Sequence, residues 1–253
     1  MISKVISQRT SQPGFACLTY HIVGEGQGQY AVSEGQLREH LAFLKRYGYT
    51  VEGFDGLESR VRAGKDLPER YAVVTLDDGD YSAMVSADIL SEFGFGATFF
   101  LTRDRSVGRS GYIRRSEIRE LRSRGFSLGT HGTTHRKLTF LPERACLAEL
   151  AESKEWLEGV LGEAVGYWAA PGGYVNRRVV ACAKECGYVL GGTCREWMNT
   201  GKPALPATIN RVNIRRNFSV DRIRRIACGD PAFYLWRQAR SAALYVPKQL
   251  FRG

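Results

Sequence analysis

The segment YAVVTLDDG (residues 71–79) runs from a short apolar stretch directly into two adjacent carboxylates and a glycine. Its first six residues have the composition of a buried β-strand. Adjacent side chains on a regular strand point to opposite faces, so Asp77 and Asp78 side by side indicate that the strand has ended. Gly79 allows the sharp backbone turn that must follow. The segment therefore predicts a strand that delivers carboxylates to one edge of a sheet.

Other short apolar runs alternate with helical patterns along the rest of the chain. This alternation over 253 residues favours a parallel sheet or barrel with helices outside. Predicted strands cover residues 15–21, 71–76, 96–101, 126–131, 165–173, 188–192 and 209–214. Predicted helices start at a capping box formed by Ser33 and Gln36, then cover residues 82–93, 116–124, 142–161, 176–186 and 232–252.

The composition is that of an ordinary soluble globular protein, with 43% apolar and 25% charged residues. No apolar run reaches the ~18 residues expected of a membrane span. The first 14 residues lack the apolar core of a secretory signal, so we expect a cytoplasmic protein. The six cysteines form no CxxC pair, which predicts reduced and mostly buried thiols; Cys182 and Cys186 lack two further ligands for a zinc site.

The chain is basic, with 36 Lys and Arg against 26 Asp and Glu and a net charge of +10. This balance favours an anionic partner such as an acidic glycan or a lipid headgroup surface. No nucleic-acid-binding motif accompanies it, and a solvated basic face explains it equally well. Residues 231–253 read as a basic helix in which Trp236, Leu244 and Leu250 alternate with Arg and Lys. That helix either lies peripherally on an anionic membrane or packs on the barrel.

The segment GTHGTTH places His131 and His135 four residues apart, in a chain with only four histidines. Its glycine and threonines indicate a loop or a single turn. Two histidines and a carboxylate are a common way to hold a divalent metal with one coordination position open for water. The nitrogen and oxygen donors suit zinc and also admit cobalt or nickel. Either Asp77 or Asp78 would then be free as a base, although DDG alone is better explained as a polar turn.

Five segments place such residues directly after an apolar run. His21, Asp77, Asp78, His131 and the turn at residues 171–173 all follow a predicted strand. Active sites of α/β barrels are built at the C-terminal ends of the strands. We therefore expect these residues to meet at one rim.

The motifs TLDDG, HGTTH and AAPGG, in this order, resemble those of the polysaccharide deacetylase family (NodB homology, carbohydrate esterase family 4) over residues 15–214. The resemblance implies an irregular (β/α) barrel and a single catalytic domain over residues 1–253, with 231–253 as a C-terminal basic helix. It also implies hydrolysis of N-acetyl or O-acetyl groups on glycans.

By the same resemblance, Asp77 is the general base and Asp78, His131 and His135 are the metal ligands. Gly172 matches the position whose backbone amide stabilises the oxyanion, a role that tolerates any side chain. Ala169 stands where many members carry the arginine that orients the base. This departure leaves the positioning of Asp77 unexplained.

The catalytic acid is a second departure, because no histidine follows His135. The Tyr20–His21 pair resembles the branch that deacetylates poly-N-acetylglucosamine, in which the first strand carries the acid. His21 is therefore the expected acid, with a strand-capping role as the alternative. We expect His40 to be a surface residue, and Glu196 with Trp197 loosely matches a later motif that lines the site.

The expected function is metal-dependent hydrolysis of the N-acetyl group of an amino sugar in a polymeric, lipid-linked or small glycan. Two alternatives stay open: hydrolysis of a non-sugar amide on the same barrel, and a non-catalytic glycan-binding barrel. The sugar, the native metal and the oligomeric state do not follow from the sequence.

Overall fold

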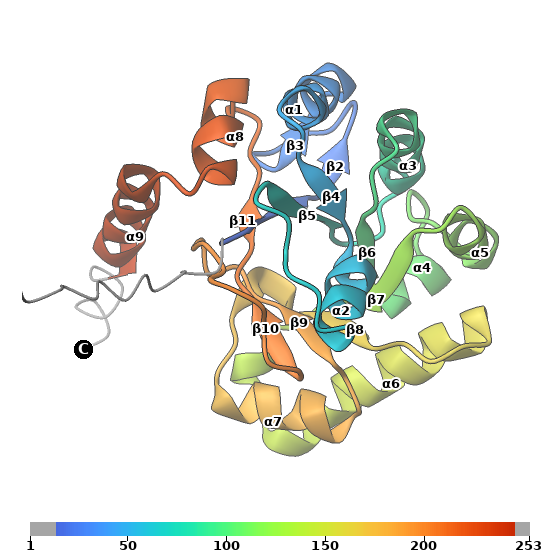
Figure 1. Ribbon diagram of the computed structural model, residues 1–253. Coiled ribbons are helices and arrows are strands. Elements are labelled where there is room, and N and C mark those ends of the chain that lie inside the picture. Colours follow the sequence, from blue (N-terminus) through green and yellow to red (C-terminus); the bar gives the residue numbers. More distant parts are fainter. Residues whose placement is uncertain (1–13, 246–253) are drawn as a thin grey trace, which may run out of the picture.

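A computed structural model describes residues 14–245 of the chain. Its centre is a curled parallel sheet with the strand order β10-β9-β8-β7-β6-β5-β1-β11, and β4 pairs with the first half of β5 (Figure 1). A separate parallel pair joins β2 and β3. The strands are β1 (Ala16–Tyr20), β2 (Ile22–Val23), β3 (Ala31–Val32), β4 (Thr50–Glu52), β5 (Tyr71–Leu76), β6 (Thr98–Leu101), β7 (Ser127–Thr130), β8 (Tyr167–Ala169), β9 (Leu190–Gly192), β10 (Ala207–Ile209) and β11 (Val212–Asn213).

The predicted irregular α/β barrel is confirmed, and the sheet is a half-barrel that does not close. Its two end strands, β10 and β11, are consecutive in the chain and are separated only by Asn210 and Arg211. The segment 209–214, predicted as one strand, therefore breaks in the middle. Arg211 lies at this break and is fully buried.

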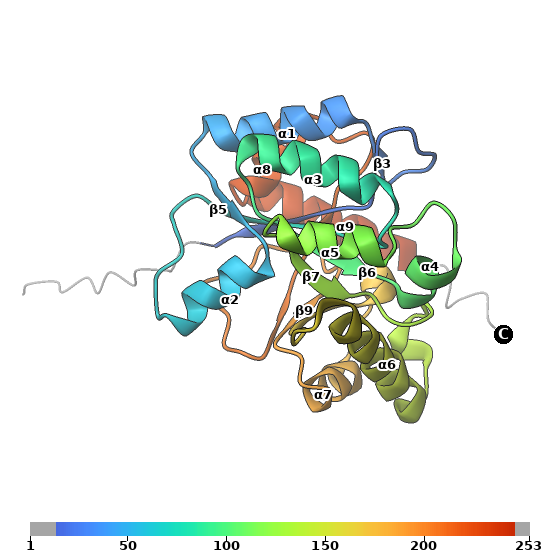
Figure 2. The same ribbon diagram turned by 90° about the vertical axis from the view of Figure 1, so that its right-hand side faces the viewer.

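Helices cover the outer face of the sheet, and α1, α3 and α5 lie side by side on it (Figure 2). The predicted capping box of Ser33 and Gln36 starts α1, and Gly94 ends α3 in the left-handed conformation that glycine adopts readily. The helices are α1 (Glu34–Arg46), α2 (Phe54–Arg62), α3 (Ser82–Phe93), α4 (Arg103–Gly108), α5 (Arg115–Ser123), α6 (Glu143–Leu161), α7 (Arg177–Glu185), α8 (Val220–Ala227) and α9 (Pro231–Tyr245), with 3₁₀ turns η1 (Leu138–Phe140) and η2 (Pro171–Gly173).

Strand alternation divides the core into two layers and positions the site. On β5, Ala72, Val74 and Leu76 pack outward against the helices, whereas Tyr71 and Val73 pack inside the curl. Since side chains alternate along a strand, the next inward positions are Thr75 and Asp77. The inside of the curl thus changes from apolar at the start of β5 to polar where β5 ends.

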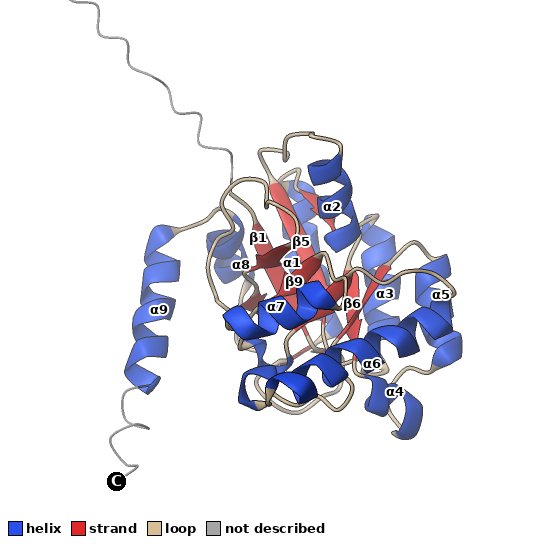
Figure 3. Ribbon diagram, turned by 90° about the horizontal axis from the view of Figure 1, so that it is seen from below, coloured by secondary structure: helices blue, strands red, loops and turns tan. Residues whose placement is uncertain are grey.

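The C-terminal helix begins packed on the fold and lies to one side of the sheet (Figure 3). Phe233 and Tyr234 are buried, and Arg237 forms a buried ion pair with Glu196. Within residues 14–245, no helix combines the length and the apolar composition needed to cross a bilayer. Predicted residues Lys248, Leu250 and Arg252 lie outside the described residues.

The prediction that His40 is a surface residue is wrong. Its ring is 1% exposed, with Nδ1 3.2 Å from the Tyr20 hydroxyl and Nε2 3.0 Å from the Phe218 carbonyl oxygen. His40 lies three residues after Leu37 and four before Leu44, so it shares their apolar helix face. The six cysteines are free thiols, as predicted, and three of them are fully buried.

Candidate active site

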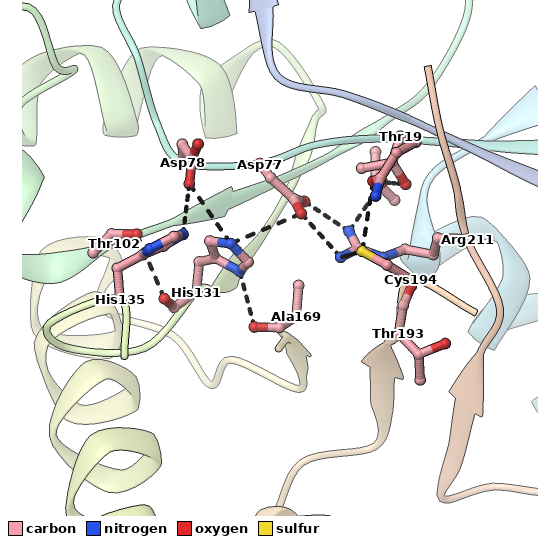
Figure 4. A network of polar contacts seen from close by, with 12 residues as sticks. Thr19, Asp77, Asp78, Thr102, His131, His135, Ala169, Thr193, Cys194 and Arg211 are labelled. Carbon is pink, nitrogen blue, oxygen red and sulfur yellow. Dashed lines mark hydrogen bonds and ion pairs between the residues drawn. The ribbon is translucent and has the colours of Figure 1, made fainter. Parts of the chain in front are cut away.

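The carboxyl ends of β5, β7 and β8 bring the predicted residues together (Figure 4). Asp77 and Asp78 follow β5, His131 follows β7, and the turn η2 follows β8. Suitable ligand atoms of Asp78, His131 and His135 lie within 4.8 Å of one another. His131 Nε2 is also 3.8 Å from Asp77 Oδ2, so both carboxylates border one small polar site.

Asp78 has a strained backbone and an unsatisfied carboxylate oxygen. Its φ of 80° lies in the left-handed region that non-glycine residues rarely adopt, and such strain is typical of functional sites. Nitrogens of Arg105, His135 and His131 lie 2.6, 3.0 and 3.6 Å from Oδ1, but none donates a hydrogen bond of normal geometry. Burial raises the pKa of Asp78, but His135, His131 and Arg105 together outweigh burial and lower this pKa overall.

His131 is held in one tautomer by the backbone. Its Nδ1 lies 2.9 Å from the carbonyl oxygen of Ala169, so Nδ1–H donates this bond and the Nε2 lone pair faces Asp78. Burial lowers the pKa of His131 to about 4, against the opposing effect of both aspartates. The ring is therefore neutral near pH 7, as a metal ligand must be.

The loop that carries His135 is fixed by a carboxylate from α6. Glu149 Oε2 accepts hydrogen bonds from the backbone N–H groups of Thr133 and Thr134, at 2.8 and 2.9 Å. The Thr134 hydroxyl donates to Oε1 of the same side chain. His135 itself has a φ of 64°, a second left-handed non-glycine residue in the site. Glu149 stabilises this strained loop, and the sequence reasoning missed it.

Ala169 stands where many family members carry the arginine that orients the base. In this protein Arg211 contacts Asp77 instead. Its Nη1 and Nη2 donate to Asp77 Oδ1 and Oδ2 at 2.6 and 2.9 Å, a bidentate ion pair in which both side chains are buried. The side chain enters from the break between β10 and β11, on the opposite side of Asp77 from His131 (Figure 4). The open question of how Asp77 is positioned is thereby answered.

The surroundings of Arg211 leave its guanidinium little freedom. Nε donates to the Thr193 carbonyl at 3.0 Å, and Nη1 also reaches the Thr75 hydroxyl at 3.3 Å. A Cβ at Gly192 would lie 2.5 Å from Nε, so only glycine leaves room there. Burial raises the pKa of Asp77. Arg211, followed by His131 and His21, lowers this pKa by more than burial raises it, so the carboxylate stays ionised.

The sequence did not indicate a role for Arg211, because the segment INRVNI has the pattern of an ordinary strand. One signal was present: Arg211 is a charged residue between the apolar residues Ile209 and Val212 of a predicted strand. A buried guanidinium requires an anionic partner, and Asp77 was the carboxylate without one.

The turn η2 lies directly beside the histidine loop. A Cβ at Gly132 would be 3.5 Å from Pro171 Cγ. Gly172 has a φ of 69° and is exposed, so its left-handed backbone favours glycine. The turn thus places an exposed backbone position next to the polar site.

His21 follows β1 directly, one strand away from Asp77. The Tyr20 carbonyl accepts the N–H of Asp77 at 3.0 Å, and His21 is close enough to help lower the pKa of Asp77. Its ring stacks on Tyr30 with a centroid distance of 5.0 Å. Within the described residues its buried Nδ1 has no hydrogen-bond partner, so the strand-capping alternative has no bond to support it.

Glu196 is held in ion pairs. It forms ion pairs with Arg215, at 3.8 Å, and with Arg237 of α9. Trp197 packs edge-on against Tyr234, with centroids 5.9 Å apart. The loose motif at these two positions therefore anchors the C-terminal helix.

A divalent metal fits the three converging side chains. The two imidazoles and the buried Asp78 Oδ1 make a mixed nitrogen and oxygen donor set, and Oδ1 accepts no hydrogen bond of normal geometry although Arg105 lies 2.6 Å from it.

Comparison with known proteins agrees with this geometry. The family model "Polysaccharide deacetylase" matches residues 64–191, slightly more than half of the chain. The chain is 24% identical to the putative polysaccharide deacetylase YxkH of Bacillus subtilis over 73% of its own length and 66% of that protein. It is 28% identical to a peptidoglycan-N-acetylglucosamine deacetylase of Bacillus cereus over 57% of its length and 67% of that protein.

Solved structures show the same fold. The Streptococcus pyogenes deacetylase PplD, in complex with acetate, superposes with a TM-score of 0.77 at 19% identity, covering 86% of this chain and 99% of that one. The family match, supported by the order of the motifs and by the fold, identifies the chain as a member of the polysaccharide deacetylase family, hydrolases that act on carbon–nitrogen bonds.

Proposed function

We propose that this protein hydrolyses the N-acetyl group of an amino sugar within a glycan, releasing acetate and a free amine. The observation that supports this best is that two adjacent carboxylates have different neighbours. Asp78 faces two imidazoles with an unsatisfied oxygen, whereas Asp77 is held by Arg211 on one side and lies 3.8 Å from His131 on the other. The two carboxylates thus suit two roles, ligation and proton transfer.

Asp78, His131 and His135 would hold the metal, with zinc the first choice and cobalt or nickel acceptable to the same donors. When bound, such an ion polarises the acetyl carbonyl and lowers the pKa of a water at its open position.

Asp77 would accept the proton of the attacking water. Arg211 occupies both carboxylate oxygens, which orients them and keeps the group ionised until the proton arrives. The backbone N–H of Gly172 would face the developing oxyanion. His21, protonated, would donate its proton to the sugar nitrogen as the carbon–nitrogen bond breaks.

The substrate assignment follows the relatives and the charge. The Bacillus cereus relative is named for N-acetylglucosamine in peptidoglycan, and a net charge of +10 suits an anionic glycan. An N-acetylated amino sugar in a glycan is therefore the substrate class we propose.

Metal content and acetate release together test the proposal. Protein purified without chelator should hold about one divalent ion per chain. Asp78→Ala and His131→Ala should lose both the ion and the release of acetate from penta-N-acetylchitopentaose. Asp77→Asn should keep the ion and lose about 10²–10⁴-fold in kcat.

Two results would contradict these roles. Full metal occupancy in the Asp78→Ala, His131→Ala double variant would remove the ligand assignment. An Asp77→Asn protein without metal, beside an Asp78→Asn protein with metal, would show that the two aspartates have exchanged roles.

A further inference from the structure

A cavity of about 370 Å³ borders the turn η2. Gly173 and Thr193 form part of its wall, and Arg177, Arg195 and Asn210 also line it. Apart from the Thr193 carbonyl, which holds Arg211, none of these residues has a role in the chemistry proposed above. The cavity therefore needs a separate explanation.

The cavity wall is continuous with the catalytic residues. The carbonyl of Thr193 accepts the hydrogen bond of Arg211 Nε at 3.0 Å, and Arg211 holds Asp77. Gly173 follows Gly172 directly and packs against Cys194, because a Cβ added at Gly173 would lie 2.1 Å from the Cβ of Cys194. A group seated in this cavity would thus be next to the sugar whose acetyl group faces Gly172.

Two unpaired arginine side chains make the cavity positively charged. Within residues 14–245, neither the Arg177 nor the Arg195 guanidinium forms an ion pair or a side-chain hydrogen bond. Several other exposed arginines are paired with carboxylates, as Arg62 is with Glu58 and Arg122 with Glu163. Positive charges gathered on a concave surface attract anions.

Exposed aromatic rings near the turn offer a place for a sugar ring. Tyr174 and Phe140 are 47% and 78% exposed. The Lys137 ammonium lies between them, 5.2 Å from the Tyr174 centroid and 5.7 Å from the Phe140 centroid. The apolar face of a sugar can pack on such rings, and Lys137 adds a third positive charge beside the turn.

We propose that the cavity lined by Arg177 and Arg195 is a subsite for a negatively charged substituent of the glycan, with a neighbouring sugar ring packed on Tyr174. The ligand chemistry is a carboxylate or a phosphate attached to a sugar. This inference rests on the proposed function for the identity of the reacting group. It adds that the enzyme selects an anionic glycan over a neutral one of equal length.

The test compares three N-acetylated probes on the wild type and on the Arg177→Gln, Arg195→Gln double variant. The neutral probe is tetra-N-acetylchitotetraose. The carboxylate probe is the tetrasaccharide of alternating N-acetylglucosamine and N-acetylmuramic acid, and the phosphate probe is UDP-N-acetylglucosamine. Loss of charged hydrogen bonds should raise KM for the preferred anionic probe by about tenfold, with kcat little changed. KM of the variant for the neutral probe should stay within about twofold of the wild-type value, because exposed charges that the probe does not contact contribute little to its binding.

A matched control removes the same two charges elsewhere. Arg46 and Lys65 are exposed and precede the first residues of β4 and β5, at the opposite ends of the strands from the site. The Arg46→Gln, Lys65→Gln variant has the same net charge as the test variant and should bind all three probes like the wild type. Tyr174→Ala should likewise raise KM for the probe that packs on this ring, and Tyr47→Ala, at a similar 45% exposure, is its control and should leave KM unchanged.

Direct binding separates this inference from the proposed function. Calorimetry with each probe and the wild-type protein measures affinity whether or not acetate is released. Preferential, arginine-dependent binding without acetate release would overturn the proposed function and keep the subsite. Equal affinity for neutral and anionic probes, or equal losses in the test and control variants, would overturn the subsite.

Discussion

At the scale of single residues, the central feature is that Asp77 is almost completely buried and still ionised. A lone carboxylate in such a place would take up a proton and could no longer act as a base. Arg211 prevents this by donating to both oxygens at 2.6 and 2.9 Å. The arginine thus both orients the proposed base and keeps it ionised.

Replacing Arg211 tests this dual role. In Arg211→Gln the carboxylate loses the strongest group that lowers its pKa, so the pKa of Asp77 must rise. The acid limb of the kcat/KM profile should therefore move to higher pH. Unfolding by urea should show a loss of about 3–5 kcal/mol, the usual cost of breaking a buried ion pair. An acid limb that stays in place would show that Asp77 is not the group being titrated.

Gly192→Ala provides an independent version of the same test. Its new Cβ would lie 2.5 Å from Arg211 Nε, so it displaces the guanidinium without removing it. The acid limb should move in the same direction. Gly166→Ala is the control, because its Cβ would meet the nearest atoms at an ordinary 3.5 Å.

His21 is the second residue whose role can be tested separately. A leaving amine needs a proton, and His21 lies near Asp77 with an unpartnered Nδ1. His21→Ala should keep the metal and the fold and lose about 10²–10⁴-fold in rate on an N-acetyl sugar. The loss should be much smaller on an activated acetate ester, whose leaving group hardly needs protonation. Equal losses on amide and ester would assign the proton to another group.

At the scale of elements, most helices and strands followed from local patterns. The capping box before α1 functions as predicted, and Gly94 after α3 and Asn176 before α7 also act through neighbouring residues. The break at Asn210 and Arg211 and the burial of His40 depend on contacts distant in sequence. His40 meets Phe218, and Arg211 meets Asp77. Local patterns contain no information about such partners.

The histidine loop is held by α6, which makes Glu149 a positioning residue. Loss of Glu149 would release two backbone N–H groups and the strained turn at His135. Glu149→Ala should weaken zinc binding about 10–100-fold, the usual effect of removing a group that orients a ligand. Competition with a chelating dye measures this. The exposed Glu152 of the same helix is the control, and Glu152→Ala should bind zinc normally. Unchanged affinity in Glu149→Ala would show that the loop holds itself.

At the scale of the whole molecule, the two end strands of the curled sheet are joined in the chain by Asn210 and Arg211. Strands β10 and β11 do not pair with each other, so the ion pair between Arg211 and Asp77 joins the break to the middle of the sheet. The order of the motifs predicted the family and the curl. It did not show where the curl would stay open, because that depends on how far the seven neighbouring strand pairs along the sheet accumulate twist.

The C-terminal helix raises the last question at this scale, whether the basic molecule binds a membrane surface. On the described part of α9, Phe233, Tyr234 and Arg237 face the fold, whereas Leu235 and Trp236 are 60% and 47% exposed. Arg222 lies 6.0 Å from the Trp236 ring. Exposed apolar side chains beside cations are typical of surfaces that contact anionic lipids.

We expect the full chain to sediment with vesicles containing phosphatidylglycerol at low salt and to remain in solution at high salt or with phosphatidylcholine alone, since salt screens surface charges. Leu235→Ser with Trp236→Ser should abolish this binding. Truncation after Asp230 is a poorer test, because it also removes Arg237 and leaves Glu196 without its buried partner. Tyr47→Ser, which exchanges an exposed aromatic outside α9, should bind like the wild type. Absence of salt-sensitive binding, or binding that survives the double substitution, would leave α9 as a helix that only packs on the fold.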